Sequence, residues 1–166
     1  MKVRFVDNAS HVDLRGEFRR IFDSEWNGLQ HFNFKQTGIS KNPKRNTLRG
    51  MHYQTYGPPE HKLIAVLSGS IHLVVSNAHL VSEVSEVQNE YFLISDTSKS
   101  SLLVPSGLAT GWISLADSVI ISYMMTARYQ DCKYSGFRFN DTFAQIKWPN
   151  VPQIISEKDL NWQSLK

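Results

Sequence analysis

Short apolar segments separated by turn residues dominate the chain after residue 61. Segments 62–67, 71–75, 91–94, 101–104, 111–115 and 119–126 are rich in aliphatic residues, and residues 81–87 mix apolar and polar positions as a half-exposed strand does. Turn-forming residues occupy positions 96–99, 105–107 and 116–118. Strands of this length, spaced about a dozen residues apart or less, predict an antiparallel β-sandwich or β-barrel.

Local patterns refine this prediction at five places. Segments 62–67 and 71–75 flank Ser68-Gly69-Ser70, which predicts a hairpin-like pair. Residues 23–29 predict a short helix capped by Asp23 or Ser24, and the alternation around Phe32 and Phe34 predicts a strand. Residues 148–152 resist regular structure, whereas residues 156–159 predict a capped turn or a short helix. We therefore expect one all-β domain over residues 1–166 with small helical additions.

Residues 48–54 (Leu-Arg-Gly-Met-His-Tyr-Gln) combine a guanidinium, a glycine, an imidazole and a phenol between two turn-rich segments. In a regular strand, Arg49, Met51 and Tyr53 share one face, and Leu48, Gly50, His52 and Gln54 share the other. A histidine beside a glycine has room for a ligand, although a core or surface role for His52 is an equally simple interpretation. If Arg49 and His52 both face one ligand, then Gly50 marks a local distortion or Arg49 reaches the ligand around an edge.

Composition limits the classes of protein that fit. A chain of 166 residues with 41% hydrophobic and 20% charged residues is typical of a soluble globular protein. We find neither an apolar run of about 18 residues nor the apolar core of a signal peptide, and the single Cys132 fits a reducing compartment, so a cytoplasmic location is expected. The net charge of +3 is mild and scattered, so nucleic acid is disfavoured, and no membrane is expected either. A small anionic ligand bound by a few arginines explains the charge equally well, and so does an excess without function.

Several polar residues are candidates for chemistry at a β-sandwich mouth. Lys62 opens a strand, so its neighbour His61 must point to the opposite face, and Tyr123 lies in an almost wholly apolar strand where a phenol needs a polar partner. Asp141 and Asp159 are the aspartates that could partner a histidine. Each of these residues also has a simpler interpretation. Lys62 can be a solvated strand end, Tyr123 a core aromatic, and the two aspartates turn or cap residues. No spacing rule joins these positions to His52.

Metal and nucleophile chemistry are both disfavoured by the sequence. None of the histidines forms a His-x-His pair; they are His11, His31, His52, His61, His72 and His79. The Gly-x-Ser-x-Gly elbow of serine hydrolases is absent too. We therefore expect no metal and no cofactor.

Motifs along nearly the whole chain resemble the dTDP-4-dehydrorhamnose 3,5-epimerase family, which are metal-free cupins acting on nucleotide-linked 4-keto-6-deoxy sugars. The matching segments are residues 13–18, 48–54, 62–63, 104–109, 140–141, 146–149 and 156–159. The resemblance implies an all-β, double-stranded β-helix (cupin or jelly-roll) sandwich with a few short helices. It also implies a homodimer that exchanges N-terminal strands, a nucleotide-diphosphate 4-ketosugar as substrate, and a role in making deoxysugars for products such as cell-surface polysaccharides.

The resemblance also implies a role for each matching residue. His52 would be the general base, Asp159 its carboxylate partner with Asp141 as the second choice, Tyr123 the general acid, and Lys62 the cation beside the keto oxygen. Arg49 would bind near the sugar and phosphates. Arg15 would reach the nucleotide diphosphate in the partner subunit's site. The remaining positions implied to contact substrate are Arg20, Gln36, Thr110, Arg138 and Asp141.

Four departures from the family pattern concern recognition rather than proton transfer. Thr110 stands where the family usually has histidine, and Arg20 replaces an acidic residue. Residues 36–38 (Gln-Thr-Gly) replace Gln-x-Asn, and residues 76–78 (Ser-Asn-Ala) replace Asp-x-Arg. We expect retained proton chemistry with an altered substrate, CDP- or dTDP-linked, or inversion at only one of C3 and C5. The alternatives are a 3,4-ketoisomerase on the same scaffold and a non-catalytic sugar-binding cupin.

Overall fold

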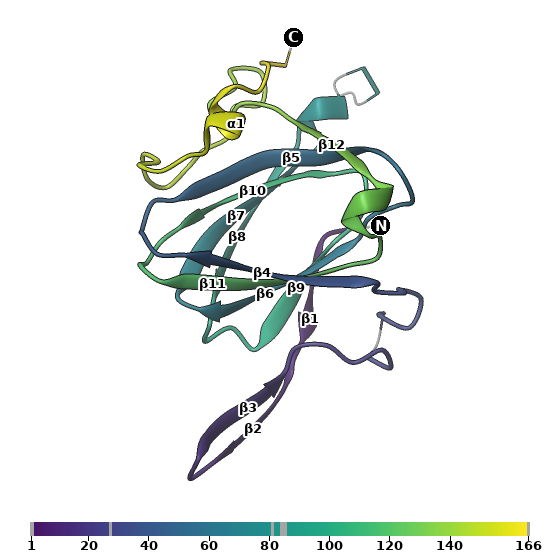
Figure 1. Cartoon of the computed structure of the whole chain (residues 1–166), viewed down its shortest axis with the longest axis vertical. Helices are drawn as coiled ribbons and strands as arrows, with labels where there is room; N and C mark the ends of the chain where they lie inside the picture. Colours follow the sequence, from purple (N-terminus) through teal and green to yellow (C-terminus); the bar gives the residue numbers. More distant parts are fainter. Residues whose placement is uncertain (1, 27, 81, 84–85, 166) are drawn as a thin grey trace.

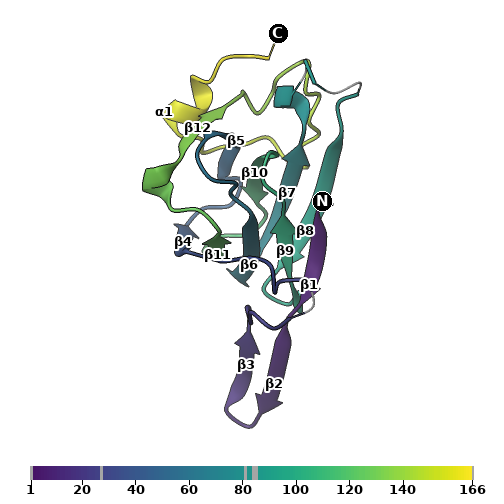
Figure 2. The same ribbon diagram turned by 90° about the vertical axis from the view of Figure 1, so that its right-hand side faces the viewer.

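Two five-stranded antiparallel sheets face each other in the computed structural model, which describes residues 2–26, 28–80, 82–83 and 86–165 (Figures 1 and 2). In spatial order, the first sheet consists of β1 (Arg4–Asp7), β9 (Ser100–Val104), β6 (Lys62–Ser68), β11 (Val119–Met125) and β4 (Gln36–Asn42). The second consists of β12 (Lys133–Gly136), β5 (Leu48–Tyr56), β10 (Ala109–Ser114), β7 (Ser70–Ser76) and β8 (Asn89–Ser95). This arrangement confirms the predicted jelly-roll sandwich.

A two-stranded hairpin, formed by β2 (Ala9–Asp13) and β3 (Gly16–Arg20), extends away from the sandwich (Figure 1). Gly16 has a φ of 121° at its turn, a value that glycine adopts readily. Arg19 anchors the base of the hairpin, because its guanidinium donates to the backbone carbonyls of Asp96, Ser98 and Val66. The helical elements are short: η1 (Ala78–Leu80), η2 (Tyr129–Asp131) and α1 (Glu157–Leu160).

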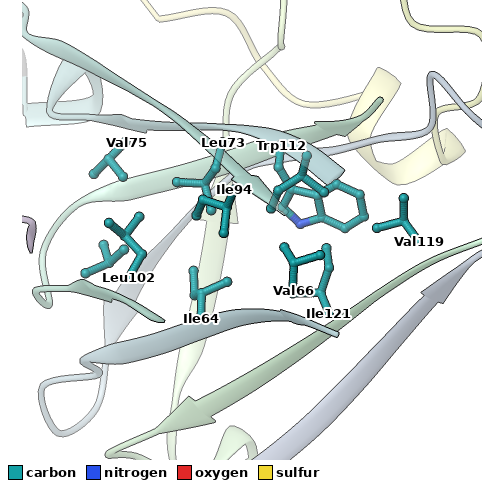
Figure 3. Packing of buried hydrophobic residues seen from close by; sticks show 11 residues of the cluster. Ile64, Val66, Leu73, Val75, Ile94, Leu102, Trp112, Val119 and Ile121 are labelled. Carbon is teal, nitrogen blue, oxygen red and sulfur yellow. The ribbon is translucent and has the colours of Figure 1, made fainter. Parts of the chain in front are cut away.

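The main core lies between the two sheets and is built from alternating strand positions (Figure 3). Ile64, Leu102 and Ile121 come from the first sheet, and they face residues of the second sheet that include Leu73 and Trp112. All five are almost fully buried. Because apolar burial is the main favourable term in folding, this layer fixes the distance and orientation between the sheets that carry the site.

Most predicted strands are confirmed, but the predicted hairpin around Gly69 is wrong. β6 pairs with β9 and β11, whereas β7 pairs with β8 and β10, so the two strands lie in different sheets. Gly69, with a φ of 75°, turns the chain from one sheet to the other. A side chain there would approach Val119 Cγ2 to 2.9 Å, so glycine is needed both for its conformation and for its size.

Three other local expectations fail in the described residues. Residues 24–25 and 28–29 lie in turns and Trp26 in a bend instead of forming a helix, and Asn27 lies outside the described residues. The Asp23 carboxylate accepts from the Glu25 backbone N–H (3.0 Å). Phe32 and Phe34 belong to no strand; their rings pack into a cluster with Leu29 and Leu63.

The expected strand over residues 81–87 is also absent from the part of this segment that the structure describes. Ser82 and Glu83 lie in a turn and Glu86 in a bend, while Val81, Val84 and Ser85 lie outside the described residues. The expectation for residues 148–152 is confirmed, and so is the capped helix at residues 156–159, where Ser156 Oγ accepts from the Asp159 backbone N–H (3.1 Å). Within the described ranges, no helix is long and apolar enough to cross a membrane.

A half-buried histidine on the outer side of the second sheet predicts sensitivity to acid. The His79 ring stacks on Tyr53 with centroids 4.1 Å apart, and burial lowers the pKa of His79 to about 4. In the unfolded chain a histidine takes up its proton near pH 6.5, so acidification between pH 6.5 and 4 favours unfolding. We expect His79→Phe to remove about 1–2 kcal/mol of this acid-dependent loss in the free energy of unfolding, because the ring is only partly shielded from solvent.

Urea unfolding at pH 7 and at pH 4.5 measures this difference. Exposed His31 offers the control, because His31→Phe should leave the pH dependence of stability unchanged. Equal pH dependences for His79→Phe and the unaltered protein would contradict the prediction.

Candidate active site

A distortion in β5 brings Arg49 and His52 to the same face. On the neighbouring strand β10, Thr110 lies opposite His52 and Trp112 opposite Arg49, so three residue steps on β5 match two on β10. The extra residue is a β-bulge, which resets the alternation of side chains. The sequence left two ways for Arg49 and His52 to face one ligand, and the bulge confirms the first of them, a local distortion at Gly50. The regular alternation expected across residues 48–54 is therefore wrong after Gly50.

Glycine is required where the bulge meets β10. Gly50 has a φ of 131°, and a side chain at this position would meet Gly111 Cα at 2.5 Å. Met51, which follows it, is completely buried in a cluster on the outer side of the sheet. Arg49 instead crosses to the opposite sheet, where its Nε donates to Asn42 Oδ1 of β4 (2.9 Å).

His52 is held by a buried carboxylate from the end of the chain. Asp159 Oδ1 lies 2.6 Å from His52 Nε2 and 3.2 Å from the Trp162 indole nitrogen, and Asp159 Oδ2 accepts from the Gly50 backbone N–H (3.1 Å). Burial alone would raise the pKa of Asp159, but these hydrogen bonds outweigh it and leave the pKa below its ordinary value. The ionised carboxylate therefore accepts a hydrogen bond from His52 Nε2–H, which leaves the lone pair of the neutral imidazole on Nδ1.

Lys62 and Tyr123 approach from the other sheet. Tyr123 on β11 is paired with Ile64 on β6, two residues beyond Lys62, so Lys62 and Tyr123 project from the same face. His61 points away, with Nδ1 accepting from the Ser106 backbone N–H (3.2 Å), as the alternation predicted. Burial raises the pKa of Tyr123, while Trp112 and the charge of Arg49 lower it in part, so the phenol keeps its proton at neutral pH.

These side chains line one cavity of about 450 Å³ between the sheets. Of the residues predicted from sequence, His52, Lys62, Tyr123, Arg49 and Thr110 line it. Asp159 lies behind His52 and is only 3% exposed. A pocket of this size suits a small ligand, and its polar groups come from both sheets.

The cavity also holds residues that the sequence reasoning missed, namely Ser40, Glu60, Trp112, Tyr129, Tyr134, Ser135, Lys158 and Trp162. Glu60 follows Pro58-Pro59 and looks like an ordinary turn residue in the sequence. Its side chain is nevertheless buried, with Oε2 accepting from the Tyr134 hydroxyl (2.5 Å) and Oε1 lying 3.5 Å from Lys62 Nζ. A charged residue directly after a proline turn and two positions before Lys62 was the available signal.

Five other predicted site residues do not line this cavity. Arg15 is exposed at the tip of the hairpin and pairs with Asp13 (2.6 Å). Arg20, at the end of β3, lies 3.6 Å from Asp23. Gln36 accepts from the backbone N–H of Tyr129.

Arg138 and Asp141 occupy the segment after β12. Arg138 is exposed, whereas Asp141 is buried and its carboxylate accepts from the backbone N–H groups of Phe143, Ala144 and Leu165. Asp159 and not Asp141 is therefore the residue that contacts His52. In the described residues, no group of three His, Cys, Asp or Glu side chains is arranged to hold a metal ion.

The jelly-roll fold encloses a cavity with an imidazole on one sheet and a lysine and a phenol on the other, an arrangement that can move protons to and from a small ligand. A family model described as dTDP-4-dehydrorhamnose 3,5-epimerase matches residues 2–166. The chain belongs to this family, and it is accordingly a carbohydrate epimerase.

Individual relatives agree with this assignment. The dTDP-4-dehydrorhamnose 3,5-epimerase of Methanothermobacter thermautotrophicus is 32% identical, over 97% of this chain and 88% of the relative. The Bacillus anthracis enzyme of the same name, solved with TDP and PPi bound, superposes with a TM-score of 0.85 at 26% identity, covering 99% of this chain and 94% of that one. The Sulfolobus tokodaii enzyme gives a TM-score of 0.82 at 27% identity, covering 98% and 89%.

Proposed function

We propose that this protein inverts C5, C3 or both in a nucleotide-linked 4-keto-6-deoxy sugar, with His52 as base and Tyr123 as acid. The single observation that carries this proposal is the arrangement of the Asp159–His52 pair and the Lys62–Tyr123 pair on opposite walls of one cavity. Family membership supplies the class of reaction.

The proposed chemistry begins with proton abstraction beside the C4 ketone. Such a proton is acidic because the electron pair of the broken C–H bond moves onto the ketone oxygen as an enolate. His52 Nδ1 takes the proton, Asp159 stabilises the resulting imidazolium, and the Lys62 ammonium stabilises the enolate oxygen. The two charges that develop in this scheme, on the imidazolium and on the enolate oxygen, thus each lie beside a protein group of opposite charge.

Inversion then requires a proton on the face opposite to the one that lost it. His52 lies on β5 of the second sheet and Tyr123 on β11 of the first, so a sugar between the sheets has one of them on each side. The raised pKa of Tyr123 keeps its proton available for the carbanion carbon. Two groups on one sheet could exchange the proton but could not invert the centre so simply.

The altered residue Thr110 supports a narrowed reaction. Thr110 lies opposite His52 on β10, and its hydroxyl accepts from Lys62 Nζ (3.4 Å). A hydroxyl neither carries charge nor titrates at neutral pH, so this position contributes no second base or acid. We therefore favour inversion at a single centre, on a dTDP- or CDP-linked sugar.

Binding of the nucleotide diphosphate is proposed for Arg49 and, across a dimer with exchanged N-terminal strands, for Arg15 and Arg20. The projecting β2–β3 hairpin supports this, because every residue of β2 is exposed and Arg15 lies at its tip. Gln36, Arg138 and Asp141 remain proposed substrate contacts only through the family resemblance. A single catalytic domain in the cytoplasm fits these proposals.

The test is hydrogen exchange in deuterated water with dTDP- and CDP-linked 4-keto-6-deoxy sugars, followed at C3 and C5 by NMR. Deuterium with inversion at one centre is the expected result. A ketone that moves from C4 to C3 would identify a ketoisomerase instead. Ligand binding without exchange at either carbon would contradict any catalytic role and leave a sugar-binding cupin.

A further inference from the structure

A buried acid lies beside the proposed enolate-stabilising lysine. Glu60 is 4% exposed and lines the cavity, with one carboxylate oxygen 3.5 Å from Lys62 Nζ and the other accepting from the Tyr134 hydroxyl (2.5 Å). Charged side chains are rarely buried unless paired, and here both oxygens have partners. The proposed mechanism assigns Glu60 no step.

Glu60 is itself fixed by hydrogen bonds within the loop around it. Its backbone N–H donates to Gln54 Oε1 (3.0 Å), and Gln54 Nε2 donates to the Pro58 carbonyl (2.7 Å). Burial and the Glu60 carboxylate also raise the pKa of Tyr134, so its phenol remains a donor. Hydrogen bonds therefore hold both the backbone and the carboxylate of Glu60 in place without a ligand.

Lys62 has no such internal constraint. A lysine side chain has four rotatable bonds, and the described residues offer its ammonium two partners, Glu60 and Thr110 Oγ1 (3.4 Å). The Thr110 hydroxyl carries no charge, so it attracts the ammonium only weakly. The charged partner is thus the group that decides where the ammonium lies.

We propose that Glu60, supported by Tyr134, is a positioning residue that holds the Lys62 ammonium at the point where the enolate oxygen forms. This deepens the proposed function and rests on it for the role of Lys62. Stabilisation of a developing charge depends on a donor that is already in place, and a displacement of about 1 Å can lower the rate by about a hundredfold. Glu60 does not contact the reacting carbons.

The test uses Glu60→Gln, which keeps size and an oxygen acceptor for Tyr134 but removes the charge. We expect kcat to fall by about tenfold to a hundredfold while KM changes by less than about threefold. Tyr134→Phe removes only the hydroxyl donor, and should lower kcat by about threefold to tenfold, as expected for one ordinary hydrogen bond. Glu90→Gln, at an exposed position of β8, is the matched control and should retain full activity.

A second measurement does not depend on turnover. The Lys62 ammonium signal in 15N-labelled protein, assigned by its loss in Lys62→Met, should shift or broaden in Glu60→Gln and stay unchanged in Glu90→Gln. This readout reports the position of Lys62 even if a variant is inactive. Thermal unfolding of each variant shows whether it is folded.

The outcomes separate the two proposals. Turnover by the unaltered protein, with kcat and the Lys62 signal of Glu60→Gln both equal to those of Glu90→Gln, overturns the role of Glu60. A rise in KM at constant kcat overturns it too, because it would indicate substrate binding rather than positioning. A Lys62 signal that responds to Glu60→Gln, in a protein that exchanges no sugar hydrogen, supports the placement of Lys62 and overturns the proposed function.

Discussion

Replacing His52 with alanine is expected to lower hydrogen exchange at the reacting sugar carbon by about 10²–10⁴-fold, the usual contribution of a general base. His52 is the proposed base, with Asp159 2.6 Å from its Nε2 and its Nδ1 free of the carboxylate. Tyr123 cannot replace it, because its raised pKa leaves almost no phenolate at neutral pH.

The measurement is deuterium incorporation by NMR under conditions of substrate saturation. The side chain of His52 is 37% exposed, so its truncation leaves the core between the sheets intact and thermal unfolding should change little. His31→Ala, at an exposed position, is the control and should exchange at the normal rate. Undiminished exchange in a folded His52→Ala protein would show that another group is the base.

Tyr123→Phe is expected to separate exchange from inversion. Without the phenol, His52 can still remove a proton and return deuterium to the same face, so label should enter the sugar with retained configuration. Inverted product should form about 10²–10⁴-fold more slowly, because the proton donor on the opposite sheet is lost. The separation follows from the placement of the two groups on opposite sheets.

Both quantities can be read from one NMR time course that resolves the labelled substrate from the labelled epimer. Tyr56→Phe is the control, since Tyr56 is 69% exposed at the end of β5 and outside the cavity lining. Equal losses of exchange and inversion in Tyr123→Phe would mean that Tyr123 acts before or during proton abstraction, contrary to its assignment as the acid.

Local periodicity identified the strands but not their partners. The segments that became β6, β7, β9, β10 and β11 are visible as apolar runs, because strand formation depends on residue type and alternation. The turn at Gly69 looks identical for a hairpin and for a crossing between sheets. The choice was made by β11 and β10, which lie far along the chain and pair with β6 and β7 respectively.

Aromatic segments near the N-terminus show the same limit. Phe32 and Phe34 have the alternation of a strand, but their rings are taken up by a cluster with Phe22, whose ring centroid lies 5.1 Å from that of Phe34. Tertiary packing therefore overrode the local pattern. The prediction for residues 156–159 succeeded because a serine cap acts within four residues and needs no distant partner.

The sequence by itself determined the strand-rich fold class, the candidate residues His52, Lys62, Tyr123 and Asp159, and, through its motifs, the family. Only the tertiary structure decided which of these residues meet. His52 and Asp159 lie 107 positions apart, and nothing local specifies that contact.

Two further features of the site also depend on distant segments. The bulge that turns both Arg49 and His52 toward the cavity becomes visible only in register with β10. The buried position of Glu60 likewise involves a distant segment, because its carboxylate accepts from Tyr134 on β12. Alternation and capping act over a few residues, whereas a catalytic cavity is assembled by strand pairing and core packing between segments that the sequence separates.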